Sequence, residues 1–98
     1  MTASNNSVYG FYISGSGFFS NCSGNNNTGS GYYIGSGSTE MINCLAVNNT
    51  TYGIELLNSS TLIQNVTVSS NGTGIYAGGS SAPTFMNVIL YNNLNNNP

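Results

Sequence analysis

Residues 53–73, GIELLNSSTLIQNVTVSSNGT, contain one complete copy of a pattern that recurs through the chain. The copy opens with a glycine anchor, Gly53, and its asparagine anchor is Asn65. The asparagine anchor recurs every 22 residues, and the glycine anchor recurs after 21 or 22 residues. The anchors are Asn21, Asn43, Asn65 and Asn87, and Gly10, Gly31, Gly53 and Gly74. Four copies in register indicate a repeat protein.

Apolar residues alternate around both anchors with a period of two. After Gly53, the apolar residues are Ile54 and Leu56, and around Asn65 they are Ile63 and Val66. This period is typical of strands, and glycine costs about 1 kcal/mol at each helical position. Short strands that meet at polar corners, repeated at a fixed interval, predict an all-β fold, a β-solenoid whose coils pair at a spacing of about 4.8 Å.

In such a fold, equivalent residues of successive coils stack into columns. We therefore expect the four asparagine anchors to form a structural ladder at one corner. Asparagine tolerates the left-handed backbone that a tight bend needs. Its side-chain amide can also exchange hydrogen bonds with the asparagine of the next coil.

The repeat resembles a known family. Segments 52–60, YGIELLNSS, and 74–80, GIYAGGS, are similar to the right-handed parallel β-helix repeat proteins, which include pectate-lyase-like enzymes, sugar-hydrolase-associated domains and many surface proteins. The resemblance extends from about Asn5 to Tyr91 and implies the right-handed winding. It does not imply one function, because the repeat is a packing pattern.

We predict a single β-helix domain over residues 1–98 with about four coils and no evident caps. The coils are expected at approximately 5–24, 25–47, 48–70 and 71–91, and a further coil begins over 92–98.

The composition excludes several classes of function. The chain contains no Lys, Arg, His or Asp, and its acids are Glu40 and Glu55. Nucleic-acid binding needs cationic side chains at the phosphates, and metal sites need clustered ligands. We therefore expect no cofactor, no metal and no nucleic-acid partner. The resemblance implies clustered Asp, Arg or Lys in the family's enzymes, and no residue matches them. We expect that the chain is not an enzyme and that both Glu residues are surface residues without partners.

The sequence favours an extracellular or cell-surface location. No apolar run approaches the 18 or so residues of a membrane span, so we expect no membrane insertion. The amino terminus lacks the features of a secretory signal, so an exported chain would be the mature form or an excised segment. Asn-x-Ser/Thr acceptors indicate a glycosylated protein, although a chain rich in Asn, Ser and Thr also produces them by chance. The acceptors are Asn5, Asn21, Asn26, Asn48, Asn49, Asn58, Asn65 and Asn71.

Cys22 and Cys44 occupy one column in successive coils. One strand spacing lies within disulfide range. However, directly stacked side chains do not readily reach the preferred disulfide dihedral, and Val66 and Val88 continue the column. We predict two stacked, buried thiols, with a disulfide as the alternative.

Tyr12, Tyr33 and Tyr76 form an outward column that Glu55 interrupts. These rings are candidates for stacking against glycans. The alternative is that they stabilise the sheet by cross-strand contact, worth roughly 0.2–1 kcal/mol per pair. Ice binding is not expected, because the threonine columns reach only two coils. The composition is also compatible with a disordered, prion-like segment, but the registered columns argue against disorder.

Both ends of the predicted solenoid lack the charges, bulges or helices that usually cover strand edges. Either the chain is an excerpt of a longer solenoid, or copies of it stack head to tail into an open filament. We expect a structural protein of a filament, sheath or surface layer whose partners are copies of itself. A carbohydrate-binding segment of a larger surface protein is the alternative. With almost no charge to titrate, we also expect stability in acid.

Overall fold

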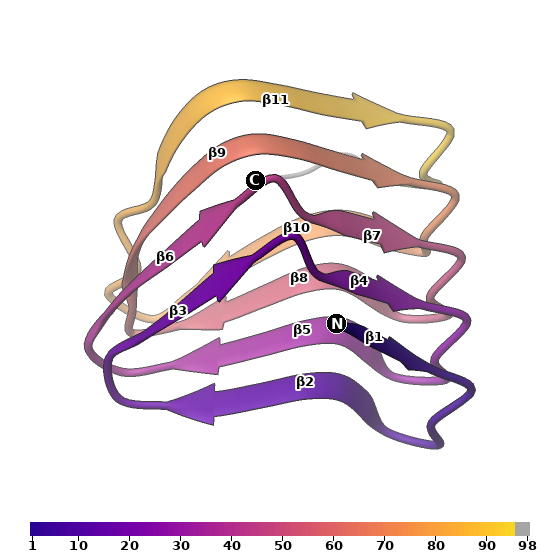
Figure 1. Cartoon of the computed structure of the whole chain (residues 1–98), viewed down its shortest axis with the longest axis horizontal. Coiled ribbons are helices and arrows are strands. Elements are labelled where there is room, and N and C mark those ends of the chain that lie inside the picture. Colours follow the sequence, from indigo (N-terminus) through magenta and orange to yellow (C-terminus); the bar gives the residue numbers. More distant parts are fainter. Residues whose placement is uncertain (96–98) are drawn as a thin grey trace.

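The fold is built entirely from strands. The computed structural model of the chain describes residues 1–95, and this part contains no helix (Figure 1). The strands are β1 (Thr2–Ser4), β2 (Tyr9–Ser14), β3 (Gly17–Ser20), β4 (Ser23–Asn25), β5 (Ser30–Gly35), β6 (Ser38–Ile42), β7 (Leu45–Val47), β8 (Tyr52–Leu57), β9 (Ser60–Ser69), β10 (Thr73–Gly78) and β11 (Thr84–Tyr91). Residues 1–95 therefore have no helix long and apolar enough to cross a membrane.

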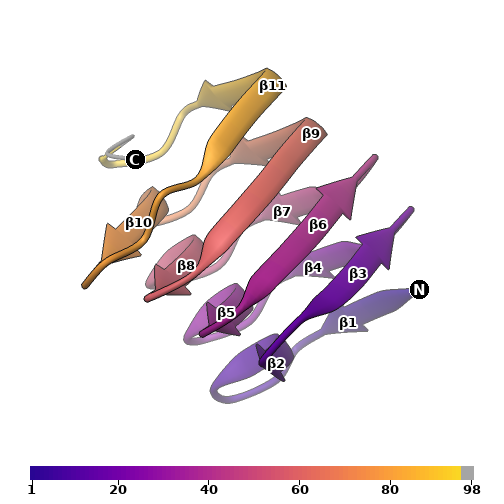
Figure 2. The same ribbon diagram turned by 90° about the vertical axis from the view of Figure 1, so that its left-hand side faces the viewer.

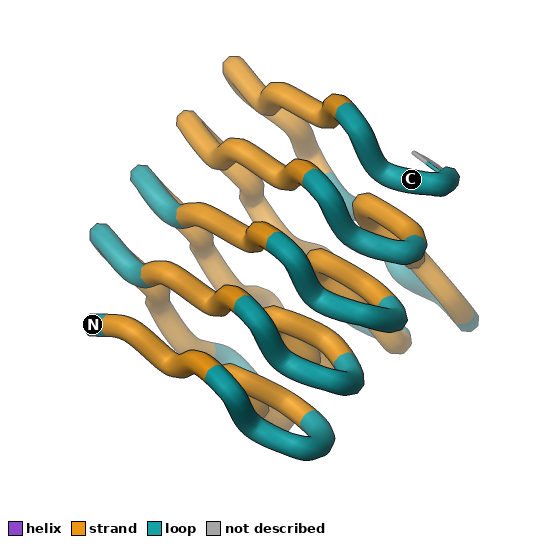
Figure 3. Tube along the Cα trace, turned by 90° about the vertical axis from the view of Figure 1, so that its right-hand side faces the viewer, coloured by secondary structure: helices purple, strands orange, loops and turns teal. Residues whose placement is uncertain are grey.

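The strands stack into two parallel sheets. The larger sheet has the order β1-β4-β7-β9-β6-β3, with β11 also paired to β9, and the smaller sheet has the order β10-β8-β5-β2. Figure 2 shows β3, β6, β9 and β11 side by side, and Figure 3 shows the successive coils as a stack of similar loops. The amino terminus lies on the first coil and residue 95 follows the last complete one (Figure 3). The predicted β-solenoid of about four coils is thereby confirmed.

Paired residues are 21 or 22 positions apart in every pair of strands. Tyr32 pairs with Ile54, for example, and Met41 pairs with Ile63. Because a closed coil can be cut at any point, the predicted coil boundaries stay a prediction. The end of the further coil, residues 96–98, lies outside the described residues.

The inward columns form the core in the middle of the stack. Tyr32, Met41, Ile54 and Ile63 are 0 % exposed. The same columns are only partly buried at the two ends, where Phe11 and Phe19 belong to the first coil. Phe85, in the last complete coil, is 39 % exposed. Each end coil therefore shows an uncovered slice of the core.

The asparagine anchors lie at equivalent corners, in the left-handed backbone conformation. Asn21, Asn43, Asn65 and Asn87 have φ values of 55, 57, 54 and 54 degrees. Their side chains are exposed, and neighbouring coils are joined here by the backbone, as where the Asn21 N–H donates to the Ile42 carbonyl over 3.1 Å. The prediction that their amides hydrogen-bond to one another was therefore wrong: a left-handed corner turns the side chain toward solvent.

Candidate functional site

A buried asparagine column carries the amide ladder instead. It consists of Asn6, Asn27, Asn49, Asn71 and Asn93. In each coil the backbone N–H and the side-chain Nδ2 both donate to the Oδ1 of the next asparagine, over 3.0 Å from Asn27 to Asn49 and 2.9 Å from Asn49 to Asn71. The second Nδ2 hydrogen is also used, since Asn49 Nδ2 donates to the Gly24 carbonyl over 3.0 Å. Asn27 and Asn49 are each 1 % exposed.

The glycine anchors make room for this ladder. A Cβ atom on Gly10, Gly31 or Gly53 would lie 2.7, 2.7 or 2.8 Å from the Nδ2 of Asn27, Asn49 or Asn71. The sequence contains the signal, because an asparagine precedes each glycine anchor by three or four residues. The interval of 21 or 22 is shared by the exposed and the buried asparagine columns, so spacing alone does not distinguish them.

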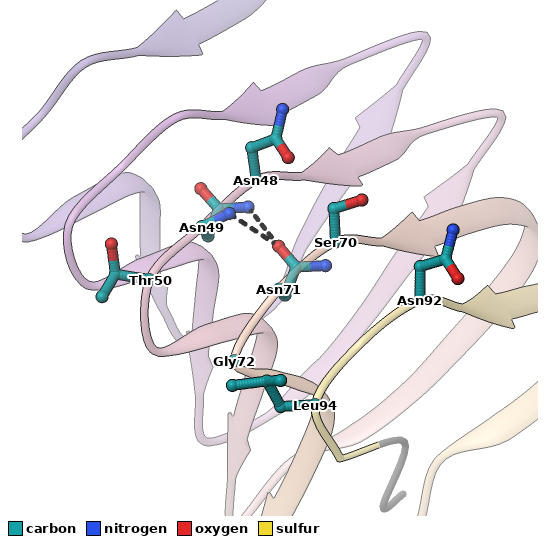
Figure 4. Close-up of a pocket in the computed structure, with 8 residues that line it drawn as sticks. All are labelled: Asn48, Asn49, Thr50, Ser70, Asn71, Gly72, Asn92 and Leu94. Carbon is teal, nitrogen blue, oxygen red and sulfur yellow. Dashed lines mark hydrogen bonds between the residues drawn. The ribbon is translucent and has the colours of Figure 1, made fainter.

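A shallow groove of about 420 Å³ runs along the outer side of this ladder (Figure 4). Asn49 and Asn71, joined by their hydrogen bonds, line it together with Asn48 and Asn92. The remaining lining residues are Thr50, Ser70, Gly72 and Leu94. None of the lining side chains titrates, so the groove offers hydrogen bonds but no acid or base.

The predicted tyrosine column lies on the outer face of the smaller sheet. Tyr12, Tyr33, Glu55 and Tyr76 pair directly across β2, β5, β8 and β10. The rings of Tyr12 and Tyr33 are stacked, with centroids 4.8 Å apart and an interplanar angle of 5°. Parallel rings at this separation overlap face to face in an offset stack. Each ring thus covers one face of the other.

Two further tyrosines, which the sequence reasoning missed, join this face. Tyr9 lies 5.0 Å from Tyr33 between ring centroids, and Tyr52 lies 5.0 Å from Tyr76. Both directly precede a glycine anchor, and that shared position was the available signal. We call Tyr9, Tyr12, Tyr33, Tyr52 and Tyr76 the tyrosine face.

Glycines two residues further along the strand leave space for two of these rings. A Cβ on Gly35 would lie 3.1 Å from Cε1 of Tyr33, and a Cβ on Gly78 would lie 2.8 Å from Cε2 of Tyr76. Alternate residues of a strand share a face, so a side chain at either position would compete with the ring.

Glu55 is half-buried within the tyrosine face and has a partner, contrary to the prediction. The hydroxyl of Ser30 donates to Glu55 Oε1 over 2.8 Å. Burial and the nearby charge of Glu55 raise the pKa of Tyr9. Glu40 is exposed on β6 in the larger sheet, so the two carboxylates lie on different sheets. Residues 1–95 also bring together no group of three or more His, Cys, Asp or Glu side chains.

The predicted glycosylation acceptors divide into exposed and buried residues. Asn5, Asn26, Asn48 and Asn58 are exposed. In contrast, Asn49 and Asn71 are 1 % and 3 % exposed and use their Nδ2 atoms in the ladder. The prediction that these two accept glycans was wrong, because the reactive nitrogen is buried and already bonded.

Cys22 and Cys44 are free, buried thiols in this structure. The Sγ of Cys44 donates to the Ile42 carbonyl over 3.4 Å. Burial raises the pKa of the Cys44 thiol. Burial also raises the pKa of Tyr32, whose hydroxyl donates to the Leu45 carbonyl over 3.0 Å. These groups are core residues that are disfavoured from ionising.

Comparison with known proteins supports the fold directly. The family model described as the right handed beta helix region matches residues 1–97. A search of curated proteins gives no match to the chain. Because the family model covers nearly the whole sequence and the strands stack as parallel coils, the chain belongs to the right-handed β-helix family.

Proposed function

We propose that the chain is a non-catalytic structural protein, an extracellular β-helical subunit that stacks end to end into a filament, sheath or surface layer. The observation that carries this proposal is the change in burial along the inward columns. In one column, Met41 and Ile63 are 0 % exposed in the middle coils, whereas Phe85 is 39 % exposed in the last complete coil. Covering such a slice of core with another coil removes apolar surface from water, which stabilises by about 25 cal/mol per Å².

The backbone supports the same proposal. β10 and β11 lie at one end of their sheets, and β2 and β3 lie at the other. The edges of these strands suit pairing with a further parallel strand. With no Lys or Arg and only two acidic residues, the subunits would repel one another little.

A lack of catalysis belongs to the proposal as well. The family includes pectate-lyase-like enzymes and proteins that are not enzymes. A glycoside-hydrolase carboxylate pair must lie within roughly 5–10 Å. Glu40 and Glu55 lie on different sheets, Glu40 exposed and Glu55 hydrogen-bonded to Ser30.

The test of axial stacking is sedimentation velocity over a range of concentrations, combined with electron microscopy. Wild type should form oligomers that grow in length with concentration. Phe85→Lys should fold and stay monomeric, because the lysine reaches water at an open end but would be a buried charge beneath another coil. Leu45→Lys is the matched control, since Leu45 is 46 % exposed on a side of the stack. It should assemble like wild type.

Two results would overturn the proposal. One is a wild-type chain that stays monomeric at its highest soluble concentration, with circular dichroism showing it folded. The other is a Phe85→Lys variant that assembles as readily as wild type. If the encoding gene continues with further 22-residue repeats, the covering coils belong to the same polypeptide rather than to copies.

The extracellular location is supported by the four exposed acceptors Asn5, Asn26, Asn48 and Asn58. Treatment of the native protein with a peptide-N-glycosidase should lower its mass. An unchanged mass together with recovery from a cytosolic fraction would contradict this location.

Carbohydrate binding on the tyrosine face is a second candidate. The observation in its favour is Tyr12, which is 62 % exposed on the edge strand β2. Against it, the stacked rings of Tyr12 and Tyr33 cover faces that a sugar would use. Soluble monomers that bind a glycan array would favour this candidate over axial stacking.

A further inference from the structure

We propose that the tyrosine face binds a cationic side chain of a partner protein, an arginine in a basic segment, with Glu55 as its counter-charge. This lateral site is separate from the ends of the stack, so it does not depend on axial assembly.

Glu55 lies in the middle of the tyrosine face. It pairs directly with Tyr33 on one neighbouring strand and with Tyr76 on the other. Tyr52, three residues before Glu55 on the same coil, stacks on Tyr76 with ring centroids 5.0 Å apart. On the other side, Tyr12 and Tyr9 pack against Tyr33. Aromatic rings therefore flank the carboxylate on both neighbouring coils.

The carboxylate has capacity left for a ligand. An ionised carboxylate has about four acceptor sites, and within residues 1–95 the structure gives Glu55 one hydrogen bond, from Ser30 to Oε1. The chain contains no Lys, Arg or His that could pair with it. A cationic group that completes the charge pair must therefore come from another molecule.

The surrounding rings suit a cation better than they suit a sugar. The faces of Tyr, Phe and Trp rings attract cations, and arginine both stacks on them and pairs with carboxylates through two parallel hydrogen bonds. Of the ring stacks in residues 1–95, those of Tyr33 are with Tyr9, Tyr12 on the first coil, so none comes from the Glu55 coil. A guanidinium group next to Tyr33 and Tyr52 can meet Glu55 without opposing any positive charge on this chain.

The experiment is a calorimetric titration of the full chain with a capped peptide of six alternating Arg-Gly units, at low salt. The peptide should bind, and Glu55→Gln should weaken binding about tenfold, because the variant keeps an acceptor for Ser30 but loses the charge. Glu40→Gln removes the same charge from the other sheet and should change affinity less than about twofold. Tyr33→Leu should weaken binding, Tyr33→Phe should preserve it, and Tyr91→Leu, away from the face, should have no effect.

Several results would overturn the proposal. These are no binding of the Arg-Gly peptide, equal losses in Glu40→Gln and Glu55→Gln, or tight binding of cellohexaose that Glu55→Gln leaves unchanged. A Glu-Gly peptide that binds as tightly as the Arg-Gly peptide would also contradict it. Circular dichroism of each variant separates loss of the site from loss of the fold.

Discussion

Asn48 and Asn49 are neighbours in the sequence and have opposite environments. Asn48 is exposed with a φ of 59 degrees, whereas Asn49 is 1 % exposed and belongs to the buried ladder. Asparagine therefore serves the corner through its backbone and the interior through its amide. The two roles respond differently to substitution.

Asn49→Ala should lower the free energy of unfolding by about 3 kcal/mol or more. The N–H and Nδ2 groups of Asn27 and the carbonyl of Gly24 would lose a buried partner, at roughly 1–3 kcal/mol for each unsatisfied group. Asn48→Gly, which keeps the left-handed backbone, should change stability by less than about 1 kcal/mol. Urea denaturation followed by circular dichroism measures both. Equal effects of the two substitutions would show that the ladder does not stabilise the fold.

The corner column gives a second prediction. Asn43 has a φ of 57 degrees, so Asn43→Gly should cost less than about 1 kcal/mol. Asn43→Val should cost about 1–2 kcal/mol or more, because a β-branched residue is strained in this conformation. The thermal unfolding midpoints of the two variants provide the comparison, and a valine variant as stable as the glycine variant would refute the backbone explanation.

At this scale the sequence predicted the exposed asparagine corners but placed the amide ladder in the wrong column. Asn21 and Asn27 both recur with the same interval, and the interval reveals stacking without revealing which side faces the core. The burial of Asn27 depends on the missing side chain of Gly31 and on the close approach of the next coil, which are properties of the folded coil.

Among the elements, the glycine at the start of each strand in the smaller sheet is required by packing. A Cβ on Gly53 would lie 2.6 Å from Val68 Cγ1, 2.7 Å from the Gly74 carbonyl oxygen and 2.8 Å from Asn71 Nδ2. The strand β8 can therefore approach the buried ladder only without a side chain at this position.

Gly53→Ala should destabilise the protein by about 2 kcal/mol or more, since overpacking a closed site typically costs 1–3 kcal/mol. Gly17→Ala is the control, because its Cβ would meet only atoms of the Ile13 side chain, which can rotate away. Chemical denaturation of both variants tests this difference. A Gly53→Ala protein as stable as Gly17→Ala would contradict the packing of β8 against the ladder.

The strands of the smaller sheet were predictable from the glycine anchors and the alternating residues that follow them, as in β5 and β8. The larger sheet was predicted less completely. Two short strands were expected to meet at each corner, as β6 and β7 do around Asn43, but β9 runs through Asn65 without interruption. Because Asn43 and Asn65 have nearly the same φ, 57 and 54 degrees, the anchor itself does not distinguish the two cases.

For the whole molecule, stability should depend on pH mainly in the alkaline range. Burial raises the pKa of Tyr32 and Cys44 in the folded state. Between the unfolded pKa values, about 8.5 for Cys and 10 for Tyr, and the higher folded values, only the unfolded chain releases these protons. The unfolded state then binds fewer protons, so the free energy of unfolding falls as pH rises above about 9.

Urea titrations at a series of pH values check this dependence. Tyr32→Phe should flatten the alkaline decrease, although it costs about 1 kcal/mol at neutral pH through the lost hydrogen bond to Leu45. Tyr91→Phe, at a tyrosine that is 50 % exposed, should leave the decrease unchanged. An identical slope in wild type and Tyr32→Phe would rule out the buried phenol as its source.

In acid, the same molecule should change little. The chain has two acidic side chains and no Lys, Arg or His. We expect the melting temperature to stay within a few degrees between pH 7 and about pH 2. A sharp fall in the melting temperature over this range, measured by calorimetry, would contradict the expectation.

The fold of the whole molecule followed from the repeat, but its function did not. Residues such as Ile54 and Met41 report on packing inside a coil, which the right-handed β-helix family shares among different activities. The tyrosine face could be predicted only in part, since Tyr9 and Tyr52 lie outside the repeating column, and the Ser30–Glu55 contact joins residues of different coils.

The proposal of end-to-end stacking is tested most directly by electron cryomicroscopy of the purified chain at high concentration. We predict filaments in which the end coils of adjacent copies meet at one strand spacing, with a rise of roughly 20–24 Å per subunit. Folded, isolated monomers whose Phe85 coil remains uncovered at every concentration would contradict it.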